Sequence, residues 1–309
     1  MEKPLPEHPL SPLPPLYAAW MEQVLAGPIP AETEATCNHC AMCTHTSDQP
    51  TSGTTLFFNP QVKCCTYLPT LHNFLVGRVL MDDDPALTQG QASVKARITK
   101  GVAVTPLGLG KNPIYSLLYG QSPEAFGKSS TMRCPHYIED GGLCGVWRHR
   151  ESTCVTWFCK HVRGTVSMKF WHALQQLLAG VEKNLAQWCV QELDVGVDAL
   201  RLLFPTPQDE ASHSLQSHQL DGTIDPKHYK AIWGNWIGRE EEFFIASASL
   251  VNTLNWQEIS AICGPEIEIY TRLTRQAYQA LLSDALPPHL QLRSFKTISM
   301  SPQASYVWA

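Results

Sequence analysis

Hydrophobic side chains recur at helical spacing through most of the second half of the chain. Within 166–204 one face carries Phe170, Leu174, Leu177, Leu178 and Val181. This period predicts one or two consecutive helices there. Similar patterns predict helices over 226–236, 240–254, 255–262 and 265–282. The polar stretch 205–223 predicts a linker, and an alternating pattern predicts a strand over 290–300.

The first half of the chain is less regular. Apolar periodicity predicts helices over 16–26, 68–81 and 86–100, the last ending at Gly101. Short strands are expected over 56–58 and 102–104, and the Gly/Pro/Ser-rich stretch 105–131 is expected to be mostly loop. The three aspartates at 82–84 predict a solvated turn rather than a site for a hard cation. The fold class predicted is mainly α with little β.

The pattern divides the chain into four parts. Residues 1–30 form a Pro-rich arm with a short helix, and 31–165 form a loop-rich, Cys-rich metal-binding domain. A helical domain over 166–289 and a strand-like tail over 290–309 follow.

Composition narrows the class of protein. With 44% hydrophobic and 17% charged residues, the 309-residue chain is typical of a soluble globular protein. Its net charge of −5 provides no electrostatic footprint for nucleic acid. No stretch is long and apolar enough for a membrane helix. Prolines occupy the N-terminal region where a secretory signal would need an apolar run, so we expect a cytoplasmic protein.

Nine of the eleven cysteines fall into two groups, which we expect to converge on one or two metal centres. They are Cys37, Cys40, Cys43, Cys64 and Cys65 in the first group, and Cys134, Cys144, Cys154 and Cys159 in the second. In a reducing compartment such thiols are metal ligands more often than disulfides. Cys189 and Cys263 stand alone and are expected to be buried as small hydrophobic side chains.

Thiolate-rich sites select zinc or iron–sulfur clusters. Cys37, Cys40 and Cys43 form a CxxCxxC run, but the fourth cysteine of a ferredoxin run is missing. Spacing therefore does not decide between the metals. We favour an iron–sulfur cluster, with 4Fe–4S as the preferred type, and keep zinc as the alternative. Because adjacent side chains usually diverge, we expect only one of Cys64 and Cys65 to bind a given ion.

The second cysteine group resembles a known signature. Cys134-Pro135, Gly142-Leu143-Cys144, and the run from Trp147 through Arg150 and Cys154 to Cys159 resemble the C-terminal pattern of the YkgJ-type CxxCxxCC proteins. That family is described as zinc- or iron-chelating and is similar to the flagellin lysine methylases. This chain departs from the family at Glu151, Val155 and Thr44, and its adjacent cysteines come at Cys64-Cys65. The resemblance covers 37–164 and implies a metal site.

Histidine, basic and aromatic side chains near the second cysteine group could support a metal site. His161 could replace a thiolate, although His136, His149 and His161 are more often hydrogen-bonded or exposed at such places. The basic residues Arg148, Arg150 and Lys160 could offset the charge of several thiolates or form a solvated turn. The aromatic residues Trp147, Trp157 and Phe158 are expected to shield the centre from water.

Three functions are compatible with these features. The favoured one is a metal-binding protein that uses an iron–sulfur cluster, iron or zinc in redox or protein-modification chemistry. The second is a non-catalytic scaffold stabilised by zinc, whose helical half binds a protein partner. The third, implied by the resemblance alone, is a protein lysine methylase-like enzyme. No catalytic residue is assigned.

Overall fold

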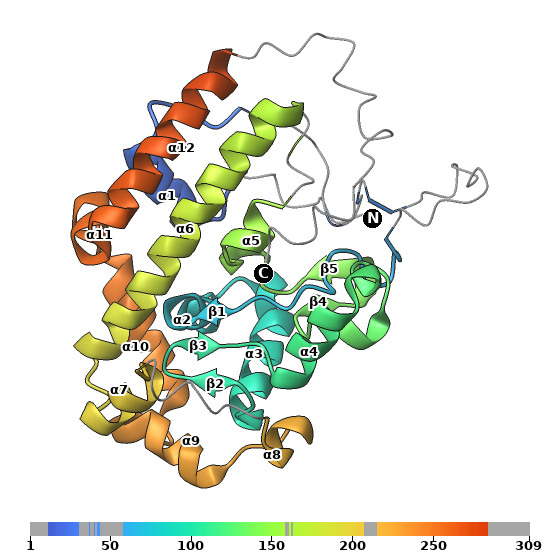
Figure 1. The fold of residues 1–309 in the computed structure, drawn as a ribbon, viewed down its shortest axis with the longest axis vertical. Helices are drawn as coiled ribbons and strands as arrows, with labels where there is room; N and C mark the ends of the chain where they lie inside the picture. Colours follow the sequence, from blue (N-terminus) through green and yellow to red (C-terminus); the bar gives the residue numbers. More distant parts are fainter. Residues whose placement is uncertain are drawn as a thin grey trace.

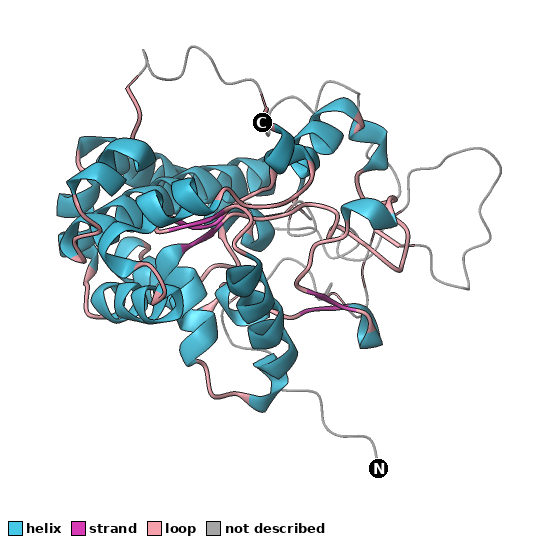
Figure 2. Cartoon of the chain, turned by 90° about the horizontal axis from the view of Figure 1, so that it is seen from below, coloured by secondary structure: helices cyan, strands magenta, loops and turns pink. Residues whose placement is uncertain are grey.

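The computed structural model describes residues 12–30, 37, 40, 42–43, 58–157, 161, 163–206 and 215–283. Within this part the chain is mainly α, as predicted, and strands are few and short (Figures 1 and 2). The helices are α1 Pro15–Val24, α2 Asn73–Met81, α3 Thr88–Lys100, α4 Pro113–Gln121, α5 Ser152–Val155, α6 Gly164–Glu192, α7 Val197–Leu203, α8 Ser217–Leu220, α9 Pro226–Trp233, α10 Glu240–Asn252, α11 Trp256–Cys263 and α12 Pro265–Ser283.

The long helix α6 forms the axis of the larger core and lies beside α12 (Figure 1). The predicted apolar stripe of α6 is fully buried, with Phe170, Leu174 and Leu177 at 0% exposure. Side chains from α1, α2, α11 and α12 complete this core. Because most of these partners are distant in sequence, the stability of α6 depends on tertiary packing as well as on its own periodicity.

A second core forms where α2 packs against α10. Its buried side chains include Val76 and Val79 of α2, Phe243 and Phe244 of α10, and Trp233 of α9. Gly77 permits this contact, because a Cβ there would lie 1.9 Å from the carbonyl oxygen of Phe244. Both cores therefore combine residues from either side of the boundary expected at 165/166.

Within the described ranges, five two-residue strands form two small sheets. In the first, β1 (Leu71–His72), β3 (Gly108–Leu109) and β2 (Val104–Thr105) pair in that order, all antiparallel. In the second, β4 (Tyr137–Ile138) pairs with β5 (Leu143–Cys144). The helix predicted over 68–81 therefore begins only at residue 73, since residues 71 and 72 pair in a sheet instead.

The prediction of loop over 105–131 was wrong at α4. This helix begins with proline at its first position and is capped by Asn112, whose side chain accepts from the backbone N–H of Tyr115 at 2.7 Å. Gly120 and the exposed leucines Leu117 and Leu118 interrupt the apolar periodicity that would have predicted this helix. The short helix α8 likewise lies within the linker predicted over 205–223. Phe58 makes an isolated bridge with Cys43, while the rest of the strand expected at 56–58 and all of 290–300 lie outside the described residues.

Most other helices match their predictions. α3 ends before Gly101, and α9 to α12 lie within two or three residues of the expected bounds. The stretch 166–204 forms two helices, α6 and α7, which are separated where Asp194 and Gly196 take positive φ angles. Cys189 and Cys263 are buried, as expected.

Candidate metal centre

Six cysteines from both groups line one cavity of about 50 Å³. They are Cys37, Cys64 and Cys65 from the first group and Cys134, Cys144 and Cys154 from the second. The cavity exceeds the roughly 10–15 Å³ that one water molecule needs. The fold therefore brings thiols together from segments that are about a hundred residues apart.

Short backbone contacts hold these cysteines in place. The N–H of Cys134 donates to the carbonyl oxygen of Cys65 at 2.6 Å, which joins the two groups directly. Cys144 lies on β5, paired with Tyr137. Cys154 lies on α5, where the Glu151 side chain caps the helix by accepting from the N–H of Cys154 at 2.9 Å.

Both Cys64 and Cys65 line the cavity, contrary to the expectation that adjacent side chains diverge. That expectation suits an extended strand. Here the residues lie in a series of tight turns, and the preceding Lys63 has a positive φ of 53°. The thiol of Cys64 also donates a hydrogen bond to Cys65, so the two sulfur atoms are neighbours.

Lys63 connects the two cysteine-bearing regions. Its ammonium group donates to the carbonyl oxygen of Cys37 and, at 2.7 Å, to that of Gly142. The side chain is 8% exposed. Since both acceptors are neutral carbonyls, these bonds leave its positive charge unneutralised close to the first cysteine group. This role was not predicted from the sequence, although a lysine directly before the Cys64-Cys65 pair was a visible signal.

Arg150 brings a second positive charge to the cavity wall. Its guanidinium donates to the carbonyl oxygens of Trp147 at 3.0 Å and Cys154 at 3.2 Å, and it stacks 3.4 Å from the centroid of the Trp147 ring. This charge acts to lower the pKa of Cys144 and Cys64. Arg148 has a different role, because it pairs with Asp82 and Asp84.

Burial disfavours the charged form of several cavity thiols. It raises the pKa of Cys134 and of Cys144 to about 12 each, and neighbouring thiols from both groups add to the effect. Burial and the Glu151 carboxylate also raise the pKa of Cys154 well above its usual range. Among the described residues, no three His, Cys, Asp or Glu side chains are already placed to hold an ion.

Aromatic side chains close one side of the cavity. Tyr67 and Trp157 both line it, with ring centroids 6.2 Å apart in a stacked arrangement. The ring centroids of Phe126 and Trp157 lie 5.3 Å apart, and the ammonium nitrogen of Lys111 lies 4.7 Å from the centroid of the Tyr67 ring. The shielding predicted for Trp157 agrees with this position, whereas Phe158 lies outside the described residues.

Cys40 and Cys43 do not line the cavity. They form a pair in which the Cys43 thiol donates a hydrogen bond to the sulfur of Cys40. This bond, assisted by backbone N–H groups and the charge of Lys63, lowers the pKa of Cys40 to about 6, while the pKa of Cys43 rises. Of the three cysteines in the CxxCxxC run, only Cys37 is part of the cavity lining. Cys159 lies outside the described residues.

Two of the three candidate histidines have partners other than sulfur. Ser93 Oγ lies 2.8 Å from Nδ1 of His136, and Arg97 lies 3.4 Å from its Nε2. His149 Nε2 lies 2.7 Å from Asp82, whose side chain is only 10% exposed. The aspartate turn at 82–84 is thus partly buried and ion-paired rather than fully solvated. The Nε2 atom of the third, His161, is buried and has no hydrogen-bond partner among the described residues.

A buried carboxyl network lies behind α5. Glu182 of α6 accepts from the Tyr17 hydroxyl, from the Ser152 N–H at 2.7 Å and from the Ser152 hydroxyl at 2.8 Å. The same hydroxyl lies 3.3 Å from Glu151, the capping residue of Cys154. Because Tyr17 and Glu182 are 165 positions apart, only the tertiary structure reveals this connection between α1, α5 and α6.

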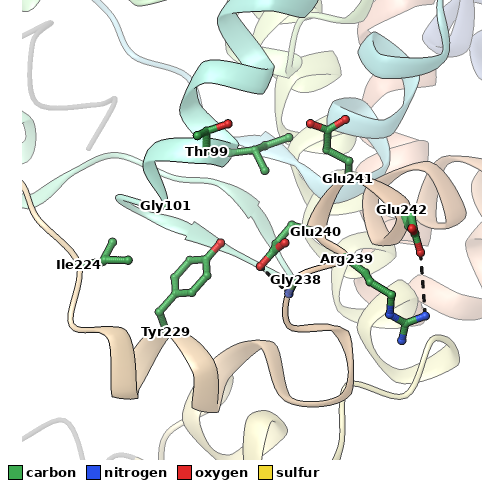
Figure 3. Close-up of a pocket in the computed structure, with 10 residues that line it drawn as sticks. Thr99, Gly101, Ile224, Tyr229, Gly238, Arg239, Glu240, Glu241 and Glu242 are labelled. Carbon is green, nitrogen blue, oxygen red and sulfur yellow. Dashed lines mark hydrogen bonds and ion pairs between the residues drawn. The ribbon is translucent and has the colours of Figure 1, made fainter.

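A larger pocket of about 400 Å³ lies elsewhere, at the end of α3 (Figure 3). Tyr229 of α9 and the first-turn glutamates of α10 line it. Glu240 accepts from the N–H of Gly238 at 3.0 Å, and burial together with the Glu240 carboxylate raises the pKa of Tyr229. This pocket contains no cysteine. Size alone would favour it, but the thiol-lined cavity has the more specific donor chemistry.

Comparison with known proteins leaves the chain without an assigned relative. It matches no protein-family model, and no curated protein and no solved structure is significantly similar to it. None of the helices in the described ranges has the length and apolar character needed to span a membrane.

Proposed function

We propose that this protein binds a metal centre through the cavity thiols, with an iron–sulfur cluster as the favoured occupant. The observation that carries the proposal is the convergence of six thiols from both cysteine groups on one cavity. Thiolates select zinc and iron–sulfur clusters over hard cations. The resemblance of the second group to iron- and zinc-chelating proteins points the same way.

The donor set fits such a centre chemically. The six cavity thiols exceed the four ligands of a zinc ion or a four-iron cluster, so a subset suffices. Binding requires thiolates, so loading releases protons, and the charge of Arg150 at the wall offsets part of the negative charge created. When bound, an iron–sulfur cluster supplies one-electron chemistry. In the protein itself, Tyr67 and Trp157 exclude water on their side of the cavity.

Anaerobic purification followed by elemental analysis tests the proposal. We expect a brown protein containing iron and acid-labile sulfide. Colourless protein with stoichiometric zinc would retain the thiolate site but overturn the cluster, and protein free of both metals would overturn the proposal.

Matched cysteine variants test the location of the centre. The triple variant Cys134→Ser/Cys144→Ser/Cys154→Ser leaves three cavity thiols, fewer than the four ligands of a zinc ion or a four-iron cluster, and is expected to lose most of the bound metal. Cys263→Ser alters a buried cysteine of α11 outside the cavity lining and is expected to retain it. Equal metal content in the two variants would contradict the assignment.

A further inference from the structure

The pocket of about 400 Å³ between the end of α3 and the start of α10, the α3–α10 pocket, has a volume typical of small-molecule sites. Part of its wall is apolar and consists of Ile98 of α3, Ile224 and the ring of Tyr229. A Cβ at Gly101 would lie 3.3 Å from both Ile224 and Tyr229, so the backbone at the end of α3 packs directly against this wall. An aliphatic part of a ligand can therefore lie here without contacting water.

Another part of the wall is acidic. Glu240 and Glu241 belong to the first turn of α10, and the end of α3, where the helix dipole is negative, lines the same space. The Tyr229 hydroxyl points toward Glu240 (Figure 3). The Glu241 side chain is half-buried and, among the described residues, has no ion-pair partner. A partly desolvated carboxylate without a partner favours a ligand that brings a positive charge.

The basic side chain that the structure places in this wall is already paired. Arg239 lies 4.0 Å from Glu242 and donates to the carbonyl oxygen of Asn235 at 3.0 Å. Its guanidinium also lies 4.5 Å from the centroid of the Trp236 ring. In Figure 3 the side chain extends toward Glu242. Arg239 therefore leaves Glu241 unneutralised.

Helix geometry argues against a bare metal ion as the occupant. Consecutive side chains of an α-helix diverge by about 100°, so Glu240, Glu241 and Glu242 cannot converge on one ion. Glu240 also accepts from the N–H of Gly238 at 3.0 Å. An organic cation makes smaller demands, because it needs one carboxylate for its charge and an apolar wall for its carbon chain.

We propose that the α3–α10 pocket binds a small organic cation, in which a primary ammonium group is carried on an aliphatic stem. The ammonium group pairs with Glu241, and the stem lies against Ile98, Ile224 and the Tyr229 ring. The face of an aromatic ring also attracts a cation. This site contains no cysteine and is independent of the metal centre proposed for the thiol cavity.

NMR of the full-length protein as purified, with labelled isoleucine methyl groups, provides the test. Ile98→Val and Ile224→Val assign the two methyl signals of the pocket. The protein is titrated at neutral pH and constant ionic strength with n-pentylamine, which is then protonated, and separately with 1-pentanol and with magnesium chloride. We expect saturable shifts of both signals with the amine, and none with the alcohol or the metal ion.

Two matched variants test the role of the carboxylate. Glu241→Gln keeps the size of the side chain but removes its charge, and it should weaken binding of the amine about tenfold or more, since a hydrogen bond to a charged group is lost. The control Glu268→Gln removes an exposed first-turn glutamate of α12 outside the pocket and should bind as the unmodified protein does. Circular dichroism checks that both variants are folded.

Three results would overturn the proposal. The first is the absence of saturable shifts at Ile98 and Ile224 with the amine. The second is equal binding of the alcohol and the amine, or equal binding of the amine by Glu241→Gln and the unmodified protein, which would leave only an apolar pocket. The third is a saturable response to magnesium that Glu241→Gln abolishes, which would identify a metal-ion site. None of these results bears on the metal content of the thiol cavity, so the two proposals fail separately.

Discussion

Replacing Glu182 by glutamine should make the protein less sensitive to alkaline pH. The Glu182 carboxyl is 2% exposed. Burial, reinforced by the nearby Glu151 carboxylate, raises its pKa from the ordinary 4.5 to about 8. The Ser152 hydroxyl joins the two carboxyl groups, because it donates to Glu182 at 2.8 Å and lies 3.3 Å from Glu151.

The sign and size of the effect follow from proton linkage. In the unfolded chain Glu182 loses its proton above pH 4.5, whereas the folded protein retains it to about pH 8. Between these values the folded state binds one more proton, so raising the pH lowers the free energy of unfolding by about 1.4 kcal/mol per unit. This stability is fully present below pH 4.5 and is lost as the pH approaches 8. The loss over the whole window is on the order of 3–5 kcal/mol.

Glutamine at 182 reproduces the protonated form. Its carbonyl can accept from Tyr17 and from the Ser152 N–H, and its amide can donate to the Ser152 hydroxyl. Urea unfolding at pH 5, 6, 7 and 8, followed by tryptophan fluorescence, measures the free energy of unfolding of both proteins. With each step up in pH, the free energy of unfolding of Glu182→Gln should rise relative to that of the unmodified protein. The control Glu192→Gln, at an exposed position at the end of α6, should show no such relative rise. A difference that is constant over this range, or that shrinks as the pH rises, would show that Glu182 is ionised in the folded protein.

Three further substitutions probe the cavity and the core. Gly90→Ala would place a Cβ 1.7 Å from the carbonyl oxygen of Gly145, beside the strand that carries Cys144, so it should lower both stability and metal content; Gly120→Ala, with no atom within 4 Å of its Cβ, should change neither. Lys63→Gln removes the buried ammonium that joins the two cysteine regions. Limited proteolysis should then cut the chain near residue 37 faster, while the thermal midpoint of helix unfolding should change less than the cleavage rate does. Leu177→Ala opens a cavity in the core of α6 and should cost about 2–5 kcal/mol in urea unfolding without reducing the metal content of the folded protein. An unchanged proteolysis pattern, unchanged metal content in Gly90→Ala, or a Leu177→Ala cost below about 1 kcal/mol would each contradict the corresponding prediction.

The sequence by itself determined the helical character and most helix positions. Local periodicity carries that information, because the buried face of a helix such as α6 repeats every three to four residues whatever its partner. It also singled out the two cysteine groups, since thiols at close spacing are unusual enough to be visible without a structure. The same reasoning missed helix α4. Its start is marked by the Asn112 cap and a proline, but its exposed leucines do not repeat as a buried face would.

The tertiary structure decided what the residues near the cysteines do. Only the fold shows that Cys37 lines the cavity while Cys40 and Cys43 do not, because the same two-residue spacing separates all three cysteines. Only the fold turns Lys63 into a link between Cys37 and Gly142, and only the fold joins Tyr17 to Glu182. These contacts join positions far apart in the chain, and no local pattern records the folding of the backbone that brings them together.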